Sequence, residues 1–320
     1  MARRDTPESS SATSGCDISI VVVSFNTARL LRKCLLSIAD SLARCPQLSH
    51  EIWVVDNASS DGSPELVARE FPHVNLIANN SNRGFAAANN QALSQTRGRF
   101  VLLLNPDTEV RDGAIATMVR FLDEHSGVGI VGARLVHSDG SFQHSCFRFP
   151  TLWMTLFDYF PIHHRLIDSR LNGRYPRRLY SRPFAIDHPL GACMLVRREV
   201  FDQIGLLDER FFIYCEEIDF CIRAKRAGWE VYCVPDAEIV HHVAQSTRQL
   251  RAEMLVELHR SRYALFEKHY SSWFRWLNRH LVRLGIAWER FRTQRQLDRG
   301  ALDANEASKR LQAYDVIARM

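Results

Sequence analysis

The amino-acid sequence predicts a doubly wound α/β domain, in which a mostly parallel sheet carries helices on both faces. Three observations support this class. Short runs of β-branched and aliphatic residues recur between residues 17 and 104, a polar loop follows each run, and apolar residues at helical spacing follow each loop. Repeated strand–loop–helix units of this kind form parallel strands that helices cover.

The individual elements follow from these patterns. The expected strands, which are nearly continuous apolar runs, cover 17–23, 51–55, 74–78 and 100–104. The expected helices, which carry apolar residues three and four positions apart, cover 30–42, 86–95 and 112–122. A further helix begins near Pro64, because proline suits the first helical turn. Asp112 is expected to cap the helix that follows it.

Polar loops follow the four strands, and they begin at Ser24, Asp56, Asn79 and Asn105. In open α/β sheets, ligands bind beyond the carboxyl ends of the strands, where these loops meet. Neither GxGxxG nor GxxxxGK[ST] is present, which disfavours a dinucleotide-binding domain and a P-loop nucleotidase. The loops carry Asp56, Asp61 and Asp107, and acids bind phosphates through a divalent cation or accept hydrogen bonds from a base or ribose. Each loop alone could equally be an ordinary turn.

Three acids, Glu216, Glu217 and Asp219, lie within four positions, between apolar residues 211–213 and a helix-like stretch at 220–224. The helix dipole stabilises ionised acids at the start of a helix. Like charges this close raise one another's pKa, which suits a general base. An acidic first turn is also common in helices without a catalytic role, so both interpretations stay open from this segment alone.

Composition sets further bounds. A chain of 320 residues with 46% hydrophobic and 24% charged residues is typical of one large globular domain or two. No run approaches the roughly eighteen apolar residues of a membrane-spanning helix. Residues 1–16 are polar and Ser-rich, so we expect a disordered tail without a secretory signal. The eight cysteines form no CxxC pair, which predicts reduced thiols of an intracellular protein.

Positive charge gathers near the C-terminus. Residues 248–299 contain twelve Arg or Lys against five Asp or Glu, together with Trp273, Trp276 and Trp288. A basic helix with tryptophan on its apolar side indicates an element that lies on a membrane surface. The alternative is a C-terminal helix that packs on the domain and exposes its arginines. Bulky aliphatic residues alternate with the basic ones and no nucleic-acid signature is present, so nucleic acid is not expected as a partner.

The segment 147–188 departs from the α/β rhythm. It contains an apolar group around Trp153 and Phe157, followed by His163-His164-Arg165 and basic residues around 174–178. Such a segment could hold a lipid diphosphate acceptor at a membrane face, or it could be a mobile loop that closes over a site.

Several segments, in this order and spacing, resemble glycosyltransferase family 2, in particular its bacterial rhamnosyltransferase-like branch. They are VVVSFN, VVDNASSDGS, NRGFAAANN, LLLNPDTEV, GACMLVR and LDERFFIYCEEIDFCIRAKRAGWEVYCVPDAEIVHH. The resemblance covers roughly Ile18 to Ser246 and implies a GT-A type doubly wound fold. It implies a nucleotide-sugar-binding half at 17–140 and an acceptor-binding and catalytic half at 141–250. The charge and the apolar pattern of the C-terminal segment predict a basic amphipathic helical extension at 251–320.

The resemblance also implies an activity. It is the metal-dependent, inverting transfer of a sugar from a nucleoside-diphosphate donor, with dTDP-rhamnose the expected one. The implied acceptor is a glycan or polyprenyl-diphosphate-linked glycan of cell-surface polysaccharide synthesis. The enzyme would work in the cytoplasm, on the inner face of a bacterial membrane. Such a transfer needs a base for the acceptor hydroxyl and positive charge for the departing diphosphate, and no covalent nucleophile.

Roles for single residues follow from the matching motifs. Asp56 would accept a hydrogen bond from a pyrimidine base, within the loop that runs to Asp61. Asp107 matches the last acid of the family's DxD motif, whose first acid is replaced here by Asn105, and would bind Mg²⁺ or Mn²⁺. His241 would be a second ligand of that cation, and His242 would point the other way by strand alternation.

Glu217 matches the catalytic base, with Asp219 as its acidic companion and Glu216 as the alternative base. The implied donor-binding residues are Ser24, Asn26, Asp56, Asn57, Asp61, Asn82, Gly84, Asn89, Asn105 and Asp107.

Two other functions are considered. A nucleotidyltransferase would need a Gly- and Lys/Arg-rich loop after the first strand, which residues 24–28 lack, and a noncatalytic nucleotide-sugar-binding protein would have no need of the catalytic acids.

Overall fold

The computed structural model describes residues 16–160, 169–242 and 251–320. The tail expected at 1–16 lies outside the described residues except for Cys16, and so do His163, His164 and Arg165 of the expected basic patch. All eight cysteines are described and are free thiols, six of them buried.

One sheet runs through the α/β part. Its main strands, in their order across the sheet, are β3 (Asn75–Ala78), β2 (His50–Asp56), β1 (Ile18–Ser24), β4 (Phe100–Leu104), β11 (Cys193–Arg197), β6 (Val128–Val136), β12 (Glu230–His241) and β5 (Thr108–Val110). The strands β1 to β4 are parallel, and β6 is parallel to β12. Strand β11 is antiparallel to both its neighbours, and β5 is antiparallel to β12. The expected mostly parallel sheet is confirmed.

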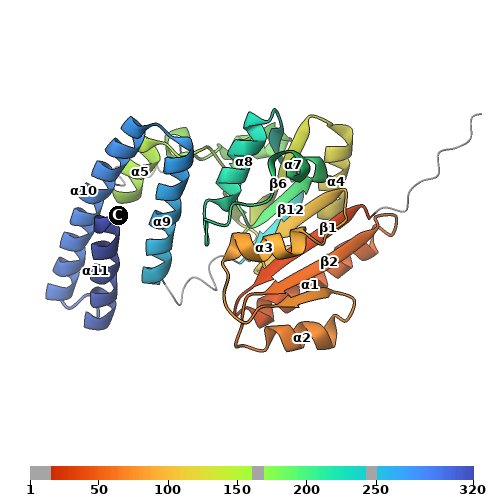
Figure 1. Ribbon diagram of the computed structural model, residues 1–320, viewed down its shortest axis with the longest axis horizontal. Coiled ribbons are helices and arrows are strands. Elements are labelled where there is room, and N and C mark those ends of the chain that lie inside the picture. Colours follow the sequence, from red (N-terminus) through yellow and green to blue (C-terminus); the bar gives the residue numbers. More distant parts are fainter. Residues whose placement is uncertain (1–15, 161–168, 243–250) are drawn as a thin grey trace, which may run out of the picture.

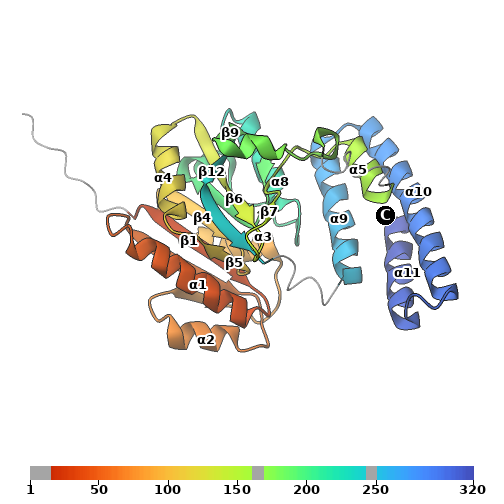
Figure 2. The same cartoon turned by 180° about the vertical axis from the view of Figure 1, so that it is seen from behind.

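Helices cover both faces of this sheet. The helices of the α/β part are α1 (Ala28–Ala43), α2 (Ser63–Glu70), α3 (Phe85–Leu93), α4 (Ala114–Glu124), α7 (Arg198–Ile204) and α8 (Glu216–Arg226). Alternation along β1 sends Ile20 and Val22 into a core with α1, α2 and α4, and Val21 and Val23 into a second core with α3, α7 and α8. Figure 1 shows α3 and α8 in front of the sheet, and Figure 2 shows α1 and α4 in front of its other face.

Two local features differ from what the sequence predicts. Asp112 does not cap α4: Gly113 occupies the N-cap position with φ 73°, and the Asp112 carboxylate pairs with Arg44 instead. A short strand that the sequence did not predict also follows β4. The Thr108 hydroxyl donates to the carbonyl oxygen of Asn105 (2.7 Å), so the chain re-enters the sheet at once as β5.

The segment 147–188 contains α5 (Leu152–Tyr159), two short 3₁₀ helices, and the small strands β8 (Cys146–Phe147), β9 (Phe184–Ala185) and β10 (His188–Pro189). Two further residues pair with the edge of β6 as β7 (Phe142–Gln143). Helix α5 leaves the α/β part and packs with the C-terminal helices (Figure 2).

The helices α9 (Arg251–His269), α10 (Ser272–Asp298) and α11 (Ala304–Arg319) form, with α5, a helical unit at one end of the molecule (Figure 1). Its core includes Tyr159, Val282 and Ile286. Gly285 allows this packing, because a Cβ atom there would lie 2.1 Å from Cγ of Tyr159. Among the described residues, no helix has the length and apolar character to cross a membrane.

Candidate active site

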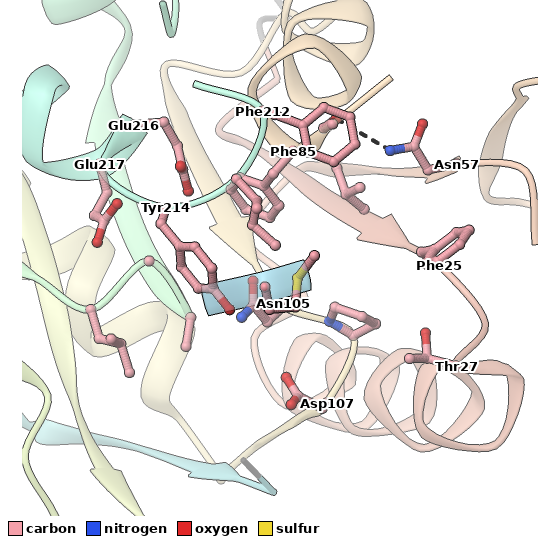
Figure 3. A pocket seen from close by; sticks show the side chains of 18 of the residues that line it. Phe25, Thr27, Asn57, Phe85, Asn105, Asp107, Phe212, Tyr214, Glu216 and Glu217 are labelled. Atoms are coloured by element: carbon pink, nitrogen blue, oxygen red, sulfur yellow. Dashed lines mark hydrogen bonds between the residues drawn. The ribbon is translucent and has the colours of Figure 1, made fainter. Parts of the chain in front are cut away.

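A cavity of about 320 Å³ lies where the carboxyl ends of β1, β2 and β4 meet the start of α8 and the end of β12 (Figure 3). It is the position that the polar loops predicted. Eight of the residues proposed from the sequence line it, and they are Asn57, Asn82, Gly84, Asn105, Asp107, Glu216, Glu217 and His241.

One wall is built by amide hydrogen bonds between loops. The side-chain Nδ2 of Asn57 donates to Oδ1 of Asn82 (2.7 Å) and to the carbonyl oxygen of Gly84 (3.2 Å). Gly84 has φ 84°, and a Cβ atom there would lie 2.5 Å from the carbonyl oxygen of Phe212, so only glycine fits. That carbonyl accepts from the N–H of Phe85 (2.6 Å), which joins this wall to the loop before α8.

The remaining donor-site candidates hold the loops in place. Ser24 bonds to the Thr27 hydroxyl, Asn26 accepts from the Ser60 N–H, Asp61 accepts from the Ala28 N–H, and Asn89 donates to the Phe85 carbonyl. None of these four lines the main cavity. Asn26 and Asp61 instead line a neighbouring hollow of about 400 Å³ beside α1.

Asp56 also lies outside the lining, at the end of β2. Its Oδ2 accepts from the N–H of Ser59 (2.9 Å), while the buried Oδ1 has no partner among the described residues. An unpartnered buried acceptor is costly unless a ligand or water satisfies it. Asp56 therefore keeps a free acceptor, as a base-binding residue would require.

The two glutamates are presented by an unusual turn. Tyr214 and Cys215 both have φ 69°, in the left-handed region where side chains other than glycine cost about 1–2 kcal/mol each. The turn starts α8 at Glu216, so that Glu216 and Glu217 reach the cavity from the first turn of the helix (Figure 3). Strain of this kind persists only where the surrounding structure enforces it, and it concentrates at functional sites.

The surroundings of this pair favour Glu217 as the base. Burial raises the pKa of Glu217 to about 7. Burial, and then the nearby Glu217 carboxylate, raise the pKa of Glu216 well above its ordinary value. Oε2 of each carboxyl group has no hydrogen-bond partner among the described residues. Near neutral pH Glu217 can therefore take up a proton, whereas burial and Glu217 hold the Glu216 carboxyl group toward its protonated form.

Asp219 has a different position. It does not line the cavity, its side chain is buried, and it lies 2.8 Å from Nε of Arg223, 2.7 Å from Nζ of Lys268 and 2.6 Å from Nε2 of His269. Burial opposes its ionisation, but the hydrogen bonds from Lys268, His269 and Arg223 outweigh that effect and lower the pKa of Asp219. The arrangement ties α8 to α9.

Asp107 and His241 lie next to each other in the cavity lining. Oδ1 of Asp107 lies 3.4 Å from Nε2 of His241, and both side chains are buried. The other ring nitrogen of His241 lies 3.1 Å from Nε2 of Gln143. His242 turns away to Glu109 (2.7 Å), as strand alternation predicted. The described residues contain no group of three or more His, Cys, Asp or Glu side chains placed to hold a metal ion.

The sequence did not indicate the rest of the lining. Phe25, Phe85, Phe212, Tyr214 and Met254 also contribute to the cavity. In a sequence, aromatic residues and methionine are interpreted as core residues. Whether they face a ligand instead depends on the conformation of the loops that carry them.

Comparisons with known proteins show the family of this chain. The chain matches the family model of glycosyl transferase family 2 over residues 19–205. A curated relative, N-acetylglucosaminyl-diphospho-decaprenol L-rhamnosyltransferase of Mycobacterium tuberculosis, is 29% identical over 81% of this chain and 86% of its own length. Rhamnosyltransferase WbbL of Escherichia coli is 24% identical over 62% of this chain and 72% of its own.

A solved structure shares the fold. The mannosyltransferase PcManGT from Pyrobaculum calidifontis, in complex with GDP-Man and Mn²⁺, superposes with a TM-score of 0.57 and 18% identity, over 94% of this chain and 85% of that one. Fold and site together define a glycosyltransferase of the GT-A type. The chain belongs to glycosyltransferase family 2, and its relatives place it among the rhamnosyltransferase-like members.

Proposed function

We propose that this glycosyltransferase moves L-rhamnose from dTDP-rhamnose to a glycan carried on a lipid diphosphate, with inversion at the anomeric carbon. The observation that carries the proposal is that Glu217, with its unpartnered oxygen, and the Asp107–His241 pair line one cavity. Figure 3 shows Glu217 and Asp107 in this lining. The relatives, which include an N-acetylglucosaminyl-diphospho-decaprenol L-rhamnosyltransferase, support this choice of sugar and acceptor.

The reaction is a single displacement. The acceptor oxygen attacks the anomeric carbon, and Glu217 takes the hydroxyl proton as that bond forms. The bond between the anomeric carbon and the diphosphate oxygen breaks, and its electron pair leaves with the nucleoside diphosphate. A single displacement inverts the anomeric centre, and Glu217 is the one proton acceptor that it requires. Asp219 positions α8 from outside the cavity and takes no part in proton transfer.

The residues present fit a divalent cation. Asp107 offers a carboxylate and His241 an imidazole at one point of the cavity. Two protein ligands suffice for Mg²⁺ or Mn²⁺ at such a site, because phosphate oxygens and water complete the coordination. When bound, the cation would neutralise charge on the departing diphosphate. Asn105 beside this pair supplies an amide in place of a second carboxylate.

The proton acceptor predicts a pH dependence. Because only ionised Glu217 can take a proton, kcat/KM should rise with pH through about 7 and then level off. The measurement is the initial rate of transfer from pH 5 to 9, with protein stability checked at each pH. A rate that stays constant down to pH 5 would contradict the assignment of Glu217.

A screen of nucleotide sugars tests the function itself. The chain is incubated with Mg²⁺ or Mn²⁺ and a panel of dTDP-, UDP- and GDP-sugars, and release of the nucleoside diphosphate is followed. We expect turnover of dTDP-rhamnose above the other donors. A nucleotidyltransferase would instead consume a nucleoside triphosphate with a sugar phosphate and release pyrophosphate, and a binding protein would bind a donor without hydrolysing it.

A lipid-linked acceptor would require the enzyme to meet a membrane, and α10 offers a suitable face. Positions 273, 276, 284, 288 and 291 form one stripe along this helix, since successive residues are 100° apart. Their side chains, Trp273, Trp276, Leu284, Trp288 and Phe291, are between 45% and 64% exposed. The opposite face of α10, with Val282 and Ile286, packs in the helical unit. The packing of this face agrees with the interpretation of a helix that packs in the protein, and the exposed stripe supports the proposal of a membrane contact.

Basic residues border the stripe. Arg279, Arg283, Arg290 and Arg292 are exposed on α10. An apolar stripe bordered by arginine suits an anionic lipid surface, where each basic residue contributes about 1 kcal/mol at low salt. We therefore place the enzyme on the cytoplasmic face of the cell membrane, held there by α10.

Replacing Trp273, Trp276 and Trp288 together by Ser should weaken binding to anionic vesicles by roughly tenfold or more, because the three rings no longer enter the interface. Vesicle flotation measures binding, and release of nucleoside diphosphate from the free donor should be unchanged. Leu36→Ser, at an exposed apolar residue of α1, is the matched control. Equal flotation of the triple variant and the wild type would exclude α10 as the membrane contact.

A further inference from the structure

A second cavity, of about 160 Å³, adjoins the first on the side of α5 and α9. Glu217 and Tyr214 line both cavities. Glu217 therefore forms part of the wall between the two cavities. Two lining residues of the second cavity, Thr151 and Asp158, are exposed, so this cavity opens to the surface of the molecule.

The second cavity combines apolar and polar walls. Phe147, Met154 and Leu258 contribute apolar surface, while Thr151, Arg262 and His188 contribute polar groups. A void left by imperfect packing in a core is lined by apolar groups alone and is closed to solvent. A pyranose ring presents apolar C–H faces and polar hydroxyl edges, which is the mixture that these walls complement.

His188 supplies an acceptor of fixed direction. Its Nδ1 lies 2.9 Å from the carbonyl oxygen of Pro189, to which it donates. Burial lowers the pKa of His188 to about 4, so the ring is neutral and Nε2 keeps a lone pair. The ring also stacks on Phe147, with 5.9 Å between ring centroids.

Arg262 supplies positive charge. Its guanidinium forms an ion pair with Asp158 at 2.6 Å. Asp158 lies 39% exposed on α5, so a bound anion could take its place without leaving a buried charge behind. Arginine suits diphosphate oxygens, because its planar group donates two parallel hydrogen bonds.

We propose that this second cavity is the acceptor subsite, where the acceptor sugar directs its reactive hydroxyl at Glu217 and its diphosphate at Arg262. The inference rests on the proposed transfer reaction and names the part of the chain that selects its acceptor. In-line displacement requires the attacking hydroxyl to come from the side opposite the leaving diphosphate. Glu217 separates this cavity from the Asp107–His241 pair, which lines only the first one.

The location also explains why the helical unit is attached to the α/β domain. Helix α9 provides Leu258 and Arg262 to the cavity, and on the same helix the Ser261 hydroxyl donates to the carbonyl oxygen of Ile213 (2.7 Å). Lys268, further along α9, binds Asp208 and Asp219 at 2.7 Å each. The unit that carries the membrane-facing stripe thus also forms one wall of the acceptor subsite.

Filling the cavity tests the proposal. The probe is N-acetylglucosamine diphosphate esterified to a short prenyl chain, and its Kd is measured by calorimetry without a donor. Leu258→Trp on α9 and Met154→Trp on α5 should each raise this Kd by roughly tenfold or more, while the Kd of dTDP stays the same. Val316→Trp, at an exposed residue of α11, is the matched control. An unchanged probe Kd in both variants, or no binding by the wild type, would overturn the proposal.

The Arg262–Asp158 ion pair provides a second test, which does not fill the cavity. Its two variants should change the affinity for the probe in opposite directions. Arg262→Gln should weaken probe binding, and Asp158→Asn should strengthen it, because the latter removes a competing anion. Neither variant should change binding of the methyl glycoside of N-acetylglucosamine. If both substitutions weaken the probe equally, the pair is only structural and Arg262 does not bind the diphosphate. A chain that binds the probe as described but transfers no sugar would contradict the proposed reaction and leave the subsite standing.

Discussion

Replacing Glu217 by Gln should lower kcat by about a hundredfold or more while donor binding is unchanged. The amide keeps the size and shape of the carboxyl group and removes the proton acceptor, and general base catalysis accounts for about this much of the rate. Single-turnover transfer and calorimetric binding of dTDP measure the two quantities separately. The acid limb of the pH–rate profile, with its midpoint at about 7 in the wild type, should also disappear.

Glu216→Gln is the matched control, one position earlier on the same helical turn. Because burial and the neighbouring Glu217 carboxylate favour the protonated form of Glu216, its amide should retain most of the activity. An inactive Glu216→Gln variant together with an active Glu217→Gln variant would move the base by one residue. Full activity in both variants would rule out a carboxylate base on α8.

Replacing Asp107 by Ala should remove the metal-dependent part of donor binding. Asp107 and His241 would hold the cation, and its charge would stabilise the bound diphosphate by several kcal/mol, so donor affinity in the presence of Mn²⁺ should fall by about a hundredfold. The wild type treated with chelator should show the same weakened affinity, and adding chelator to the variant should change nothing further. Circular dichroism and thermal unfolding check that the variant is folded.

Glu109→Gln separates this effect from a general loss of negative charge. Glu109 lies two residues further along, on β5, and pairs with His242, which does not line the cavity. Its amide should leave metal-dependent binding intact. Donor binding that responds to chelator in the Asp107→Ala variant as it does in the wild type would contradict the role of Asp107.

The first four strands and helices were predictable because each buries its apolar residues against elements nearby in sequence. Strand β11 takes a central place that local patterns do not reveal, between β4 and β6 and antiparallel to both. Strand β5 has only three residues, too few for a periodic pattern to appear. Aspartate is a common N-cap residue, which is why Asp112 was expected to cap α4. In the structure Gly113, in the left-handed region, is the N-cap, and Asp112 forms an ion pair with Arg44.

For the active site, the sequence indicated which types of residue the transfer reaction requires. It indicated only some of the positions that these residues take in the structure. Asn105, Asp107 and Glu217 line one cavity because strand ends converge at one edge of the sheet. Asp219 differs, because its partners Lys268 and His269 lie on α9, and only tertiary packing brings that helix to α8. The aromatic walls at Phe212 and Tyr214 depend on left-handed backbone at residues that carry no glycine signal.

The proposed reaction is tested most directly by the anomeric configuration of its product. The chain would be incubated with dTDP-rhamnose, Mg²⁺ and the prenyl diphosphate of N-acetylglucosamine, and the isolated product examined by NMR. We predict a new glycosidic bond whose anomeric configuration is opposite to that of the donor. A product of retained configuration, or no transfer from this donor or any other nucleotide sugar, would contradict a single displacement with Glu217 as its base.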